Sequence, residues 1–182
     1  MTPRTMAARR DADPWRLVPA LGIFEKAFFT VNMVPAREEK VTDEQRAYVR
    51  EHIALSGASL PAGYPFAGAD IRPAILPILE GASGAGFPNV IVDADGVRRR
   101  VDLVMEHDGR AYAQLGFAAL LDLMGNPEVQ VSTDRVVLKD AVLPGQEKKD
   151  ISLPLAADRR FLINWPHKDY WGSFRHITYY QL

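Results

Sequence analysis

The chain has 182 residues, of which 22 are lysine or arginine and 23 are aspartate or glutamate, so its formal net charge is −1. The length favours one domain with a core of its own, and the balanced charge argues against a nucleic-acid groove, which needs a basic excess on one face. The absence of cysteine excludes disulfides and thiolate zinc sites. No run approaches the roughly 18 apolar residues of a membrane span, and the basic start lacks the apolar stretch of a signal peptide.

The first third of the chain predicts two helices, a strand and a long loop. Residues 1–12 are polar and small, and we expect weak order there. Asp13-Pro14 can begin a helix, with aspartate as the N-cap. Residues 27–34 alternate as a strand does. Residues 42–55 predict a helix that opens with a capping box, and residues 56–69 form a loop rich in glycine, serine and proline.

The middle of the chain predicts a further helix and a β-hairpin. Asp70 can cap a helix that reaches about residue 80. Residues 89–106 predict an antiparallel hairpin, because Asp-Gly between two β-rich runs is a strong hairpin pattern. Asp93, Asp95 and Gly96 are the structural turn residues, since aspartate bonds to the backbone downstream of it and glycine supplies a positive φ. The same residues lack the further oxygen ligands of a calcium loop, so we predict no metal site.

The second half of the chain predicts a buried helix followed by strands. Residues 112–124 are apolar on nearly every face, so we expect a buried helix in which Leu120 is part of the core. Gly125 and Pro127 are typical residues for the end of such a helix. Four short strands are then expected, at residues 129–132, 135–138, 151–155 and 160–164. This order predicts a single domain of the α/β or α+β class with a mixed sheet.

Arg99 is the first candidate for a ligand-binding residue. In the predicted second strand it shares a face with Val101 and Leu103. A charge on an apolar face needs a partner, because a buried unpaired charge is very unfavourable. That partner can be an acidic side chain, which would make the pair structural, or an anionic ligand, which the planar guanidinium suits.

A second candidate cluster lies near the C-terminal end of the chain. It is dense in polar and aromatic side chains, which can line a small-molecule pocket. Its members are Trp165, His167, Lys168 and Tyr170. The alternative is an aromatic loop that packs on the edge of the sheet. We find neither a nucleophile elbow nor a phosphate-binding loop, and therefore predict a non-enzyme without a cofactor.

Three blocks of sequence occur in a recognisable order. They are Gly86-Phe87-Pro88-Asn89-Val90, Asp93-Ala94-Asp95-Gly96 with Arg99, and Asp158-Arg159-Arg160-Phe161-Leu162-Ile163-Asn164, with an apolar strand and a small-residue helix between the last two. This ordered set resembles the second type of CHASE domain, a sensory extracellular module associated with cyclases and histidine kinases. The resemblance covers about residues 70–182.

The resemblance implies a non-catalytic, extracytoplasmic sensory domain of a transmembrane signalling protein, with a cyclase, a histidine kinase or a serine/threonine kinase as its output. Its partners would be an unidentified small-molecule ligand and a second copy in a homodimer, with the membrane reached only through anchors outside this segment. The alternative is a structural or dimerisation module without a small-molecule ligand. The family's opening strand and the strand after Ile177-Thr178-Tyr179 are not seen, so we expect either the middle of the family domain, without its two ends, or a divergent member of the family.

Overall fold

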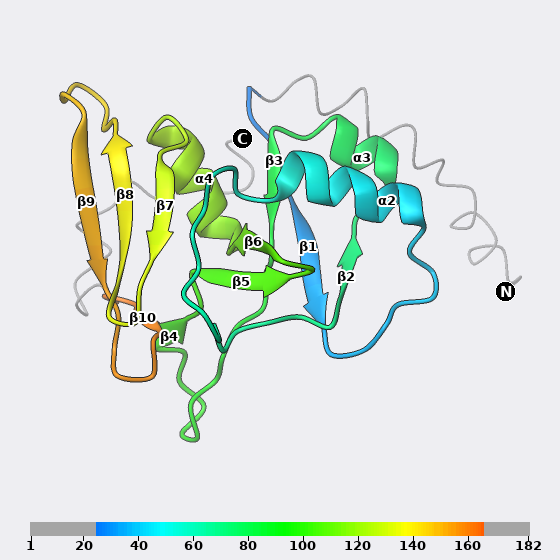
Figure 1. The fold of residues 1–182 in the computed structure, drawn as a ribbon, viewed down its shortest axis with the longest axis horizontal. Coiled ribbons are helices and arrows are strands. Elements are labelled where there is room, and N and C mark those ends of the chain that lie inside the picture. The colour runs from blue at the N-terminus through cyan, green and yellow to red at the C-terminus, as the bar shows by residue number, and fades with distance from the viewer. Residues whose placement is uncertain (1–24, 166–182) are drawn as a thin grey trace, which may run out of the picture.

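The computed structural model describes residues 25–165. The weakly ordered start and the helix predicted at Asp13 therefore lie outside the described residues, as does the chain after Trp165. The fold is α+β with a mixed sheet, as predicted (Figure 1).

The N-terminal half is built on a three-stranded mixed sheet in the order β2-β1-β3. Strand β1 (Phe28–Val34) pairs antiparallel with β2 (Asp70–Pro73) and parallel with β3 (Gly84–Gly86). Helix α2 (Asp43–Tyr48) continues directly into the π-helix η2 (Val49–Ile53), and α3 (Leu76–Glu80) connects β2 to β3. These elements enclose the N-terminal core, which consists of Val31, Met33, Val49, Ile71, Leu79, Ala85, Phe87 and Tyr112.

The capping box at the start of α2 is confirmed. The Gln45 N–H donates to the Thr42 hydroxyl (3.2 Å), and the Thr42 N–H donates to the Gln45 side-chain oxygen (3.0 Å). The helix predicted at Asp70 is wrong, because Asp70 begins strand β2 instead. A helical turn forms only after it, where Pro77 lies in the first turn of α3 and its missing N–H is tolerated.

The C-terminal half contains a three-stranded antiparallel sheet, a short hairpin and a helix of nine residues (Figure 1). The sheet consists of β7 (Glu128–Val131), β8 (Arg135–Ala141) and β9 (Lys149–Pro154), and the hairpin of β5 (Val104–His107) and β6 (Arg110–Ala113). Helix α4 (Leu115–Leu123) packs on this sheet. The C-terminal core that they share comprises Leu103, Val104, Ala111, Ala113, Phe117, Leu121, Met124, Val129, Val131, Val136, Leu138 and Ala141.

The two halves meet at a backbone contact next to β3. The Phe87 N–H donates to the Ala113 carbonyl (3.0 Å), and the Leu115 N–H donates to the Phe87 carbonyl (2.9 Å). A Cβ atom on Gly86 would lie 2.7 Å from the Ala113 carbonyl oxygen and 2.7 Å from the Leu115 Cα. Glycine is therefore needed at position 86, because only its lack of a side chain allows the two segments to approach this closely.

Asn89 completes this first sequence block. Its side-chain amide exchanges two hydrogen bonds with the backbone of Met33: the Met33 N–H donates to Asn89 Oδ1 (3.1 Å), and Asn89 Nδ2 donates to the Met33 carbonyl (2.9 Å). Strand β3 ends at Gly86, so it offers Met33 no backbone partner, and the Asn89 amide takes the place of that partner. Gly86, Phe87 and Asn89 each have a structural reason in this fold.

The hairpin predicted over residues 89–106 is wrong apart from its turn. The turn is closed by hydrogen bonds from the Asp93 N–H to the Val97 carbonyl (3.0 Å) and from the Gly96 N–H to the Asp93 carbonyl (2.8 Å), and Gly96 has a φ of +81°. Residues 89–92 form no strand, whereas β4 (Arg100–Val101) pairs with β10 (Phe161–Leu162) and β5 pairs with β6. Figure 1 shows residues 90–99, which we call the arm, extending away from the two cores.

The reason is that residues 25–165 provide no apolar surface for the arm to pack against. Val90, Val92 and Val97 are all exposed. A two-stranded hairpin is marginally stable in water unless one face packs on a core. The turn therefore forms locally, without a hairpin behind it. Strand pairing occurs instead between β4 and β10 and between β5 and β6.

The helix predicted over residues 112–124 is shorter and less buried than expected. It begins at Leu115, since Tyr112 belongs to β6, and the Gln114 side chain caps it by accepting from the Phe117 N–H (3.1 Å). Leu121 is 3 % exposed, but Leu120 is 53 % exposed. The expectation that Leu120 lies in the core is therefore wrong. The C-terminal core covers the side of α4 that carries Phe117 and Leu121 and leaves the side with Leu120 exposed. Because the helix is apolar on every side, its sequence could not show which side would be covered.

Replacing Gly86 with alanine is expected to destabilise the protein by about 1–3 kcal/mol, the usual range for an extra carbon in a packed site. The new Cβ would have to displace backbone atoms, not a flexible side chain. Denaturant unfolding followed by circular dichroism measures the change in free energy. Gly116→Ala in α4 is the control, because a Cβ there would contact only the end of the Gln114 side chain. Equal losses in both variants would contradict the role assigned to Gly86.

Leu121→Ala is expected to lower the free energy of unfolding by about 2–5 kcal/mol, because it leaves a cavity in the C-terminal core. Leu120→Ala removes the same atoms from an exposed position, and we expect a change within about 0.5 kcal/mol. The two variants differ only in which side of α4 is truncated. A larger loss for Leu120→Ala would show that this side of the helix is covered.

Candidate functional site

Arg99, the first residue predicted to bind a ligand, lies in the arm and is paired within it. Its guanidinium donates to both carboxylate oxygens of Asp95 (2.9 and 2.7 Å) and to Asp93 (3.3 Å). This contact lowers the pKa of Asp95 to about 2. The side chain of Arg99 is half-exposed, so its charge is matched by the turn's own carboxylates in contact with water.

The second predicted cluster is mostly outside the described residues. His167, Lys168 and Tyr170 lie there, and only Trp165 is described. The Trp165 ring is exposed and its Nε1 donates to the Arg98 carbonyl (2.6 Å), which places it beside the arm. A ligand-binding role for Arg99 and for this cluster stays a prediction.

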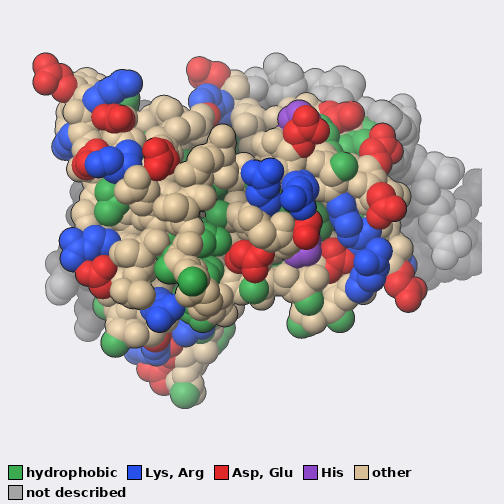
Figure 2. Space-filling view, viewed as in Figure 1, with side chains coloured by type: hydrophobic (Ala, Val, Ile, Leu, Met, Phe, Trp, Pro, Cys, Tyr) green, Lys and Arg blue, Asp and Glu red, His purple; other side chains and the backbone are tan. Residues whose placement is uncertain are grey.

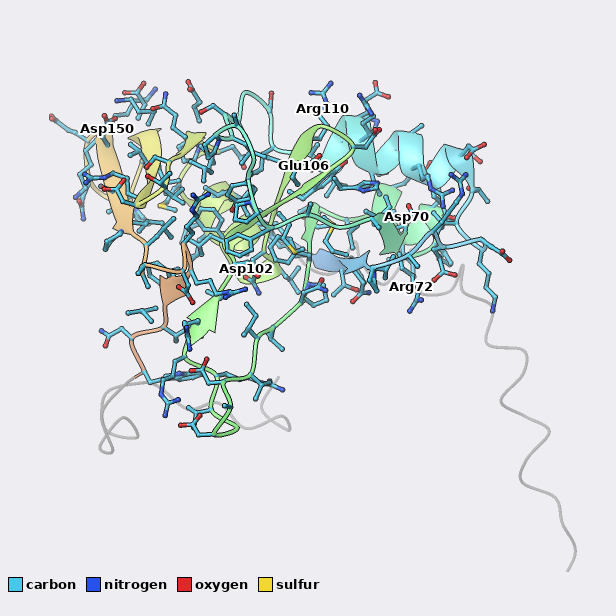
Figure 3. All side chains as sticks on the ribbon, turned by 60° about the horizontal axis from the view of Figure 1, so that its bottom comes forward. Asp70, Arg72, Asp102, Glu106, Arg110 and Asp150 are labelled. Carbon is cyan, nitrogen blue, oxygen red and sulfur yellow. The ribbon has the colours of Figure 1, made fainter. Side chains whose placement is uncertain are left out.

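A network of arginine–aspartate ion pairs, which we call the ladder, connects the arm to residues 100–102 and 158–160. Arg100 bonds to Asp93 and to Asp158 (2.7 Å each), and Arg160 bonds to Asp102 (3.0 Å). The ladder therefore joins the second and third sequence blocks, and Figure 3 shows Asp102 close to where the arm leaves the body. Burial raises the pKa of Asp102, which the Arg160 charge partly offsets. These acids and arginines are matched to one another, which is typical of a structural network.

Asp70 is the one buried charged side chain among residues 25–165, with 4 % exposure. Arg46 donates to it through Nε (3.2 Å) and Nη2 (2.7 Å), and the backbone N–H groups of Glu38 and Ile71 donate to it as well (2.7 and 2.8 Å). The Arg46 guanidinium, with these N–H groups, holds the pKa of Asp70 well below its usual range. Asp70 is thus a fully partnered anion that joins β2 to α2 (Figure 3).

A small hollow of about 110 Å³ lies next to this pair, bordered by Arg46, Arg50, His107 and Tyr112 among others. Arg50 is paired with Asp108, and His107 Nδ1 lies 3.0 Å from the Gly68 carbonyl oxygen. On the face seen in Figure 2, lysine and arginine side chains lie beside acidic ones in the same way. The charged groups around this hollow are therefore already paired.

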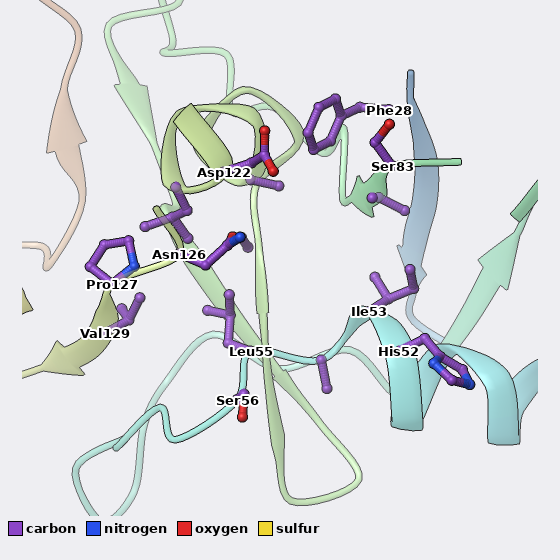
Figure 4. A pocket seen from close by; sticks show the side chains of 16 residues that line it. Phe28, His52, Ile53, Leu55, Ser56, Ser83, Asp122, Asn126, Pro127 and Val129 are labelled. Carbon is purple, nitrogen blue, oxygen red and sulfur yellow. The ribbon is translucent and has the colours of Figure 1, made fainter. Parts of the chain in front are cut away.

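The larger hollow, which we call the central pocket, has a volume of about 290 Å³ and lies between the two cores (Figure 4). Its lining includes Ala85 from the N-terminal core and Ala113, Leu121 and Val129 from the C-terminal core. The walls of this pocket are polar and apolar in about equal measure, whereas small-molecule sites combine apolar walls with a few polar groups. Its position means that a bound molecule would contact both halves of the fold at once.

The chain reaches the pocket through two unusual backbone features. In the π-helix η2, the Ala54 N–H donates to the Val49 carbonyl (3.1 Å), and such wide turns occur frequently at functional sites. The Leu55 N–H then donates to the Ala111 carbonyl (2.8 Å), which directs the chain along the pocket. On the other side, Asn126 follows α4 with a φ of +53°, a conformation that asparagine tolerates.

The polar groups of the pocket come from separate parts of the sequence. They are contributed by His52, Ser56, Ser83, Asp122 and Asn126. Asp122 is the only aspartate, glutamate, lysine or arginine in the lining, and it forms an ion pair with Lys26 just before β1. Ser83 Oγ accepts from the Ala27 N–H (3.1 Å), so the entrance to β1 is held at the rim by two contacts.

The sequence analysis did not identify this site. One pattern was available, because Asp122 is the one charged residue between Tyr112 and Met124. A single carboxylate on an apolar helix indicates an internal polar contact, although it does not say which segment provides it. The partner Lys26 and the ring of Phe28 are brought near only by the pairing of β1 with β3.

The CHASE2 domain family model matches residues 12–182. The chain is a member of the CHASE2 family. The match begins well before residue 70, so the N-terminal half belongs to the family domain together with the part that carries the three blocks. CHASE2 domains are extracytoplasmic sensory domains of signalling proteins and are not catalytic. No curated protein and no solved structure matches the chain.

Two further observations concern residues 25–165 of this CHASE2 domain. No helix in this part of the chain is long and apolar enough to cross a membrane. The same residues contain no cluster of three or more histidine, aspartate or glutamate side chains placed to hold a metal ion.

The Asp70–Arg46 pair makes a prediction about acid stability. Because the folded pKa of Asp70 is depressed, the unfolded chain binds this proton more readily than the folded one. The stabilisation is complete above the ordinary aspartate pKa of about 4 and is lost as the pH falls below it. Asp70→Asn is therefore expected to be less stable at pH 7 and to lose less stability than wild type between pH 5 and pH 2. Denaturant unfolding at a series of pH values measures both effects.

Asp43→Asn is the control for this experiment. Asp43 also faces Arg46 (3.6 Å), but its side chain is almost fully exposed. We expect this variant to follow the wild-type pH dependence. If Asp70→Asn and wild type lose stability in parallel as the pH falls, Asp70 is not the group responsible.

Proposed function

We propose that this domain is the extracytoplasmic ligand-sensing part of a transmembrane signalling protein, and that the central pocket binds its small-molecule ligand. The output in the intact protein would be a cyclase, a histidine kinase or a serine/threonine kinase. The observation that supports the pocket as the site is its place between the two cores, with walls from both. A ligand there contacts elements of both halves, which are also joined by backbone contacts such as Phe87 with Ala113 and Leu55 with Ala111.

The mechanism is a shift between two arrangements of the halves. A ligand shifts such an equilibrium only if it binds one arrangement more tightly than the other. A molecule that touches both walls meets this condition whenever the distance between the walls differs between the two states. Lys26 and Ala27 contact the rim directly, so a change there reaches the segment that leads into β1.

The alternative is a dimerisation module without a small-molecule ligand. The observation that favours it is the exposed side of α4, where Leu120 and Leu123 lie three residues apart and next to each other on the helix surface. Exposed apolar side chains that form a contiguous patch mark contact surfaces. A homodimer through this patch is compatible with ligand sensing and could also act without it.

The pocket is tested by filling it. Ala118 of α4 lines the pocket, whereas the neighbouring Ala119 does not. A panel of small molecules is screened on the 182-residue chain for compounds that raise the melting temperature, since a true ligand stabilises the folded state by mass action. We expect Ala118→Leu to weaken the binding of such a compound by about tenfold or more, and Ala119→Leu to leave it unchanged.

The outcomes separate the two functions. A compound that stabilises Ala118→Leu as much as wild type does not bind in the central pocket. A panel in which nothing binds, together with a concentration-dependent dimer that Leu120→Lys dissociates, favours the dimerisation module. The dimer is measured by sedimentation equilibrium.

A further inference from the structure

We infer that the central pocket takes a small organic cation, an amine with an apolar body, whose ammonium group replaces Lys26 at Asp122. The inference rests on the proposed function and names the class of ligand that the same pocket selects. It follows from the charge of the lining, from the nature of the group that now occupies the carboxylate, and from the aromatic ring on the opposite wall.

The charge of the lining excludes anions. Of the 16 lining residues, Asp122 is the only one of the acidic and strongly basic types, and its side chain is 19 % exposed. A carboxylate that is mostly withdrawn from water requires a cation or hydrogen-bond donors as partners. A ligand carboxylate or phosphate would meet this charge with no lysine or arginine in the lining to offset it.

Lys26 now supplies the cation, but it does so from outside the pocket. It is not part of the lining, and its side chain is 52 % exposed. A half-exposed lysine has a flexible stem and a strongly hydrated head, so its pairing with a carboxylate contributes little net stability. An incoming ammonium group can therefore take its place while Lys26 returns to water.

Phe28 provides a second element of cation recognition. Its ring lies against Gly84 of β3, where an added Cβ would come within 2.8 Å of the ring. Figure 4 shows Phe28 and Ser83 across from Asp122. The face of an aromatic ring attracts ammonium groups, and a carboxylate with a nearby ring is a combination that suits an amine.

The remaining lining defines the size and body of the ligand. The volume of about 290 Å³ is at the lower end of the range for small-molecule sites, which favours a compact molecule over a nucleotide. Ile53, Leu55 and Val129 offer apolar contacts, and the Asn126 side chain and Ser56 hydroxyl offer hydrogen bonds. The fit is to an amine with a ring or short branched chain.

The replacement of Lys26 by the ligand at Asp122 also provides a way for ligand binding to affect the segment before β1. In the structure, Lys26 ties the segment before β1 to helix α4. With an amine bound, that tie is released at the rim while the ligand contacts both halves. Ligand binding and release of the N-terminal segment are then one event.

The test uses three probes of nearly equal shape on the 182-residue chain: benzylamine, benzyl alcohol and benzoate. Affinities are measured at pH 7 by amide chemical shifts in NMR, which also locate the site. We expect benzylamine to bind at least tenfold more tightly than benzyl alcohol, and benzoate to bind more weakly than both. Asp122→Asn is expected to reduce benzylamine to the affinity of benzyl alcohol.

Lys26→Ala is the decisive variant, because it removes the competitor without touching the lining. We expect it to tighten benzylamine binding by a factor of about three or more and to leave benzyl alcohol unchanged. A purely structural Lys26–Asp122 pair predicts no such gain. Since an increase in affinity requires a folded protein, this variant decides the question even if Asp122→Asn fails to fold.

The inference is overturned if benzylamine has no advantage over benzyl alcohol, if none of the three probes binds, or if Lys26→Ala does not tighten benzylamine binding. The proposed function is judged separately. If benzyl alcohol, benzoate or a compound of the wider panel binds in a way that Ala118→Leu blocks, the pocket is a ligand site and only the cation preference is wrong.

Discussion

The contact between the Gly86–Phe87 backbone and residues 113–115 joins the two cores of this domain. It is the place where the sheet β2-β1-β3 and the β6–α4 segment approach so closely that no side chain fits at position 86. Phe87 is completely buried in the N-terminal core while its backbone bonds to the start of α4, which belongs to the C-terminal core. The central pocket lies beside this joint, with Ala85 and Ala113 in its lining.

The sequence blocks that mark the family have structural roles here. Gly86, Phe87 and Asn89 form the joint and complete the partner set of β1. The second and third blocks meet in the ladder of arginine and aspartate pairs. The pocket residues with the most distinctive chemistry, Phe28 and Asp122, lie outside all three blocks. The blocks therefore identify the fold and leave the ligand open.

Much of the fold could be predicted from sequence where one local pattern dominates. The capping box at Thr42, the turn at Gly96 and the strands after residue 127 depend on neighbours a few residues away. Predictions failed where distant partners decide. Aspartate is a common N-cap residue. The Asp70 carboxylate instead accepts hydrogen bonds from Arg46 and from the backbone N–H of Glu38, and Asp70 begins strand β2. The β-rich runs around the turn do not pair with each other, because the second run pairs with β10 and β6 instead.

The candidate site was missed for a related reason. Its members come from several segments far apart in the sequence, and none of them forms a motif with its neighbours. Arg99 attracted attention because an arginine among apolar residues needs a partner, and that reasoning holds, but the partner lies four residues away in the same turn. Asp122 is likewise a single charge among apolar residues, in a helix, and it also needs a partner. Only the arrangement of the strands shows that this partner is Lys26.

The pairing of β1 has a consequence for the order in which the chain can fold. All of its partners, from β2 and β3 to the amide of Asn89, follow it at long sequence separation. Closing such large loops is entropically unfavourable and slows folding. As the chain is made from the N-terminus, Phe28–Val34 has no strand partner until β2 has been made, and its partners are complete only when Asn89 has followed. Until then the apolar side chains of this segment have no sheet neighbours to cover them.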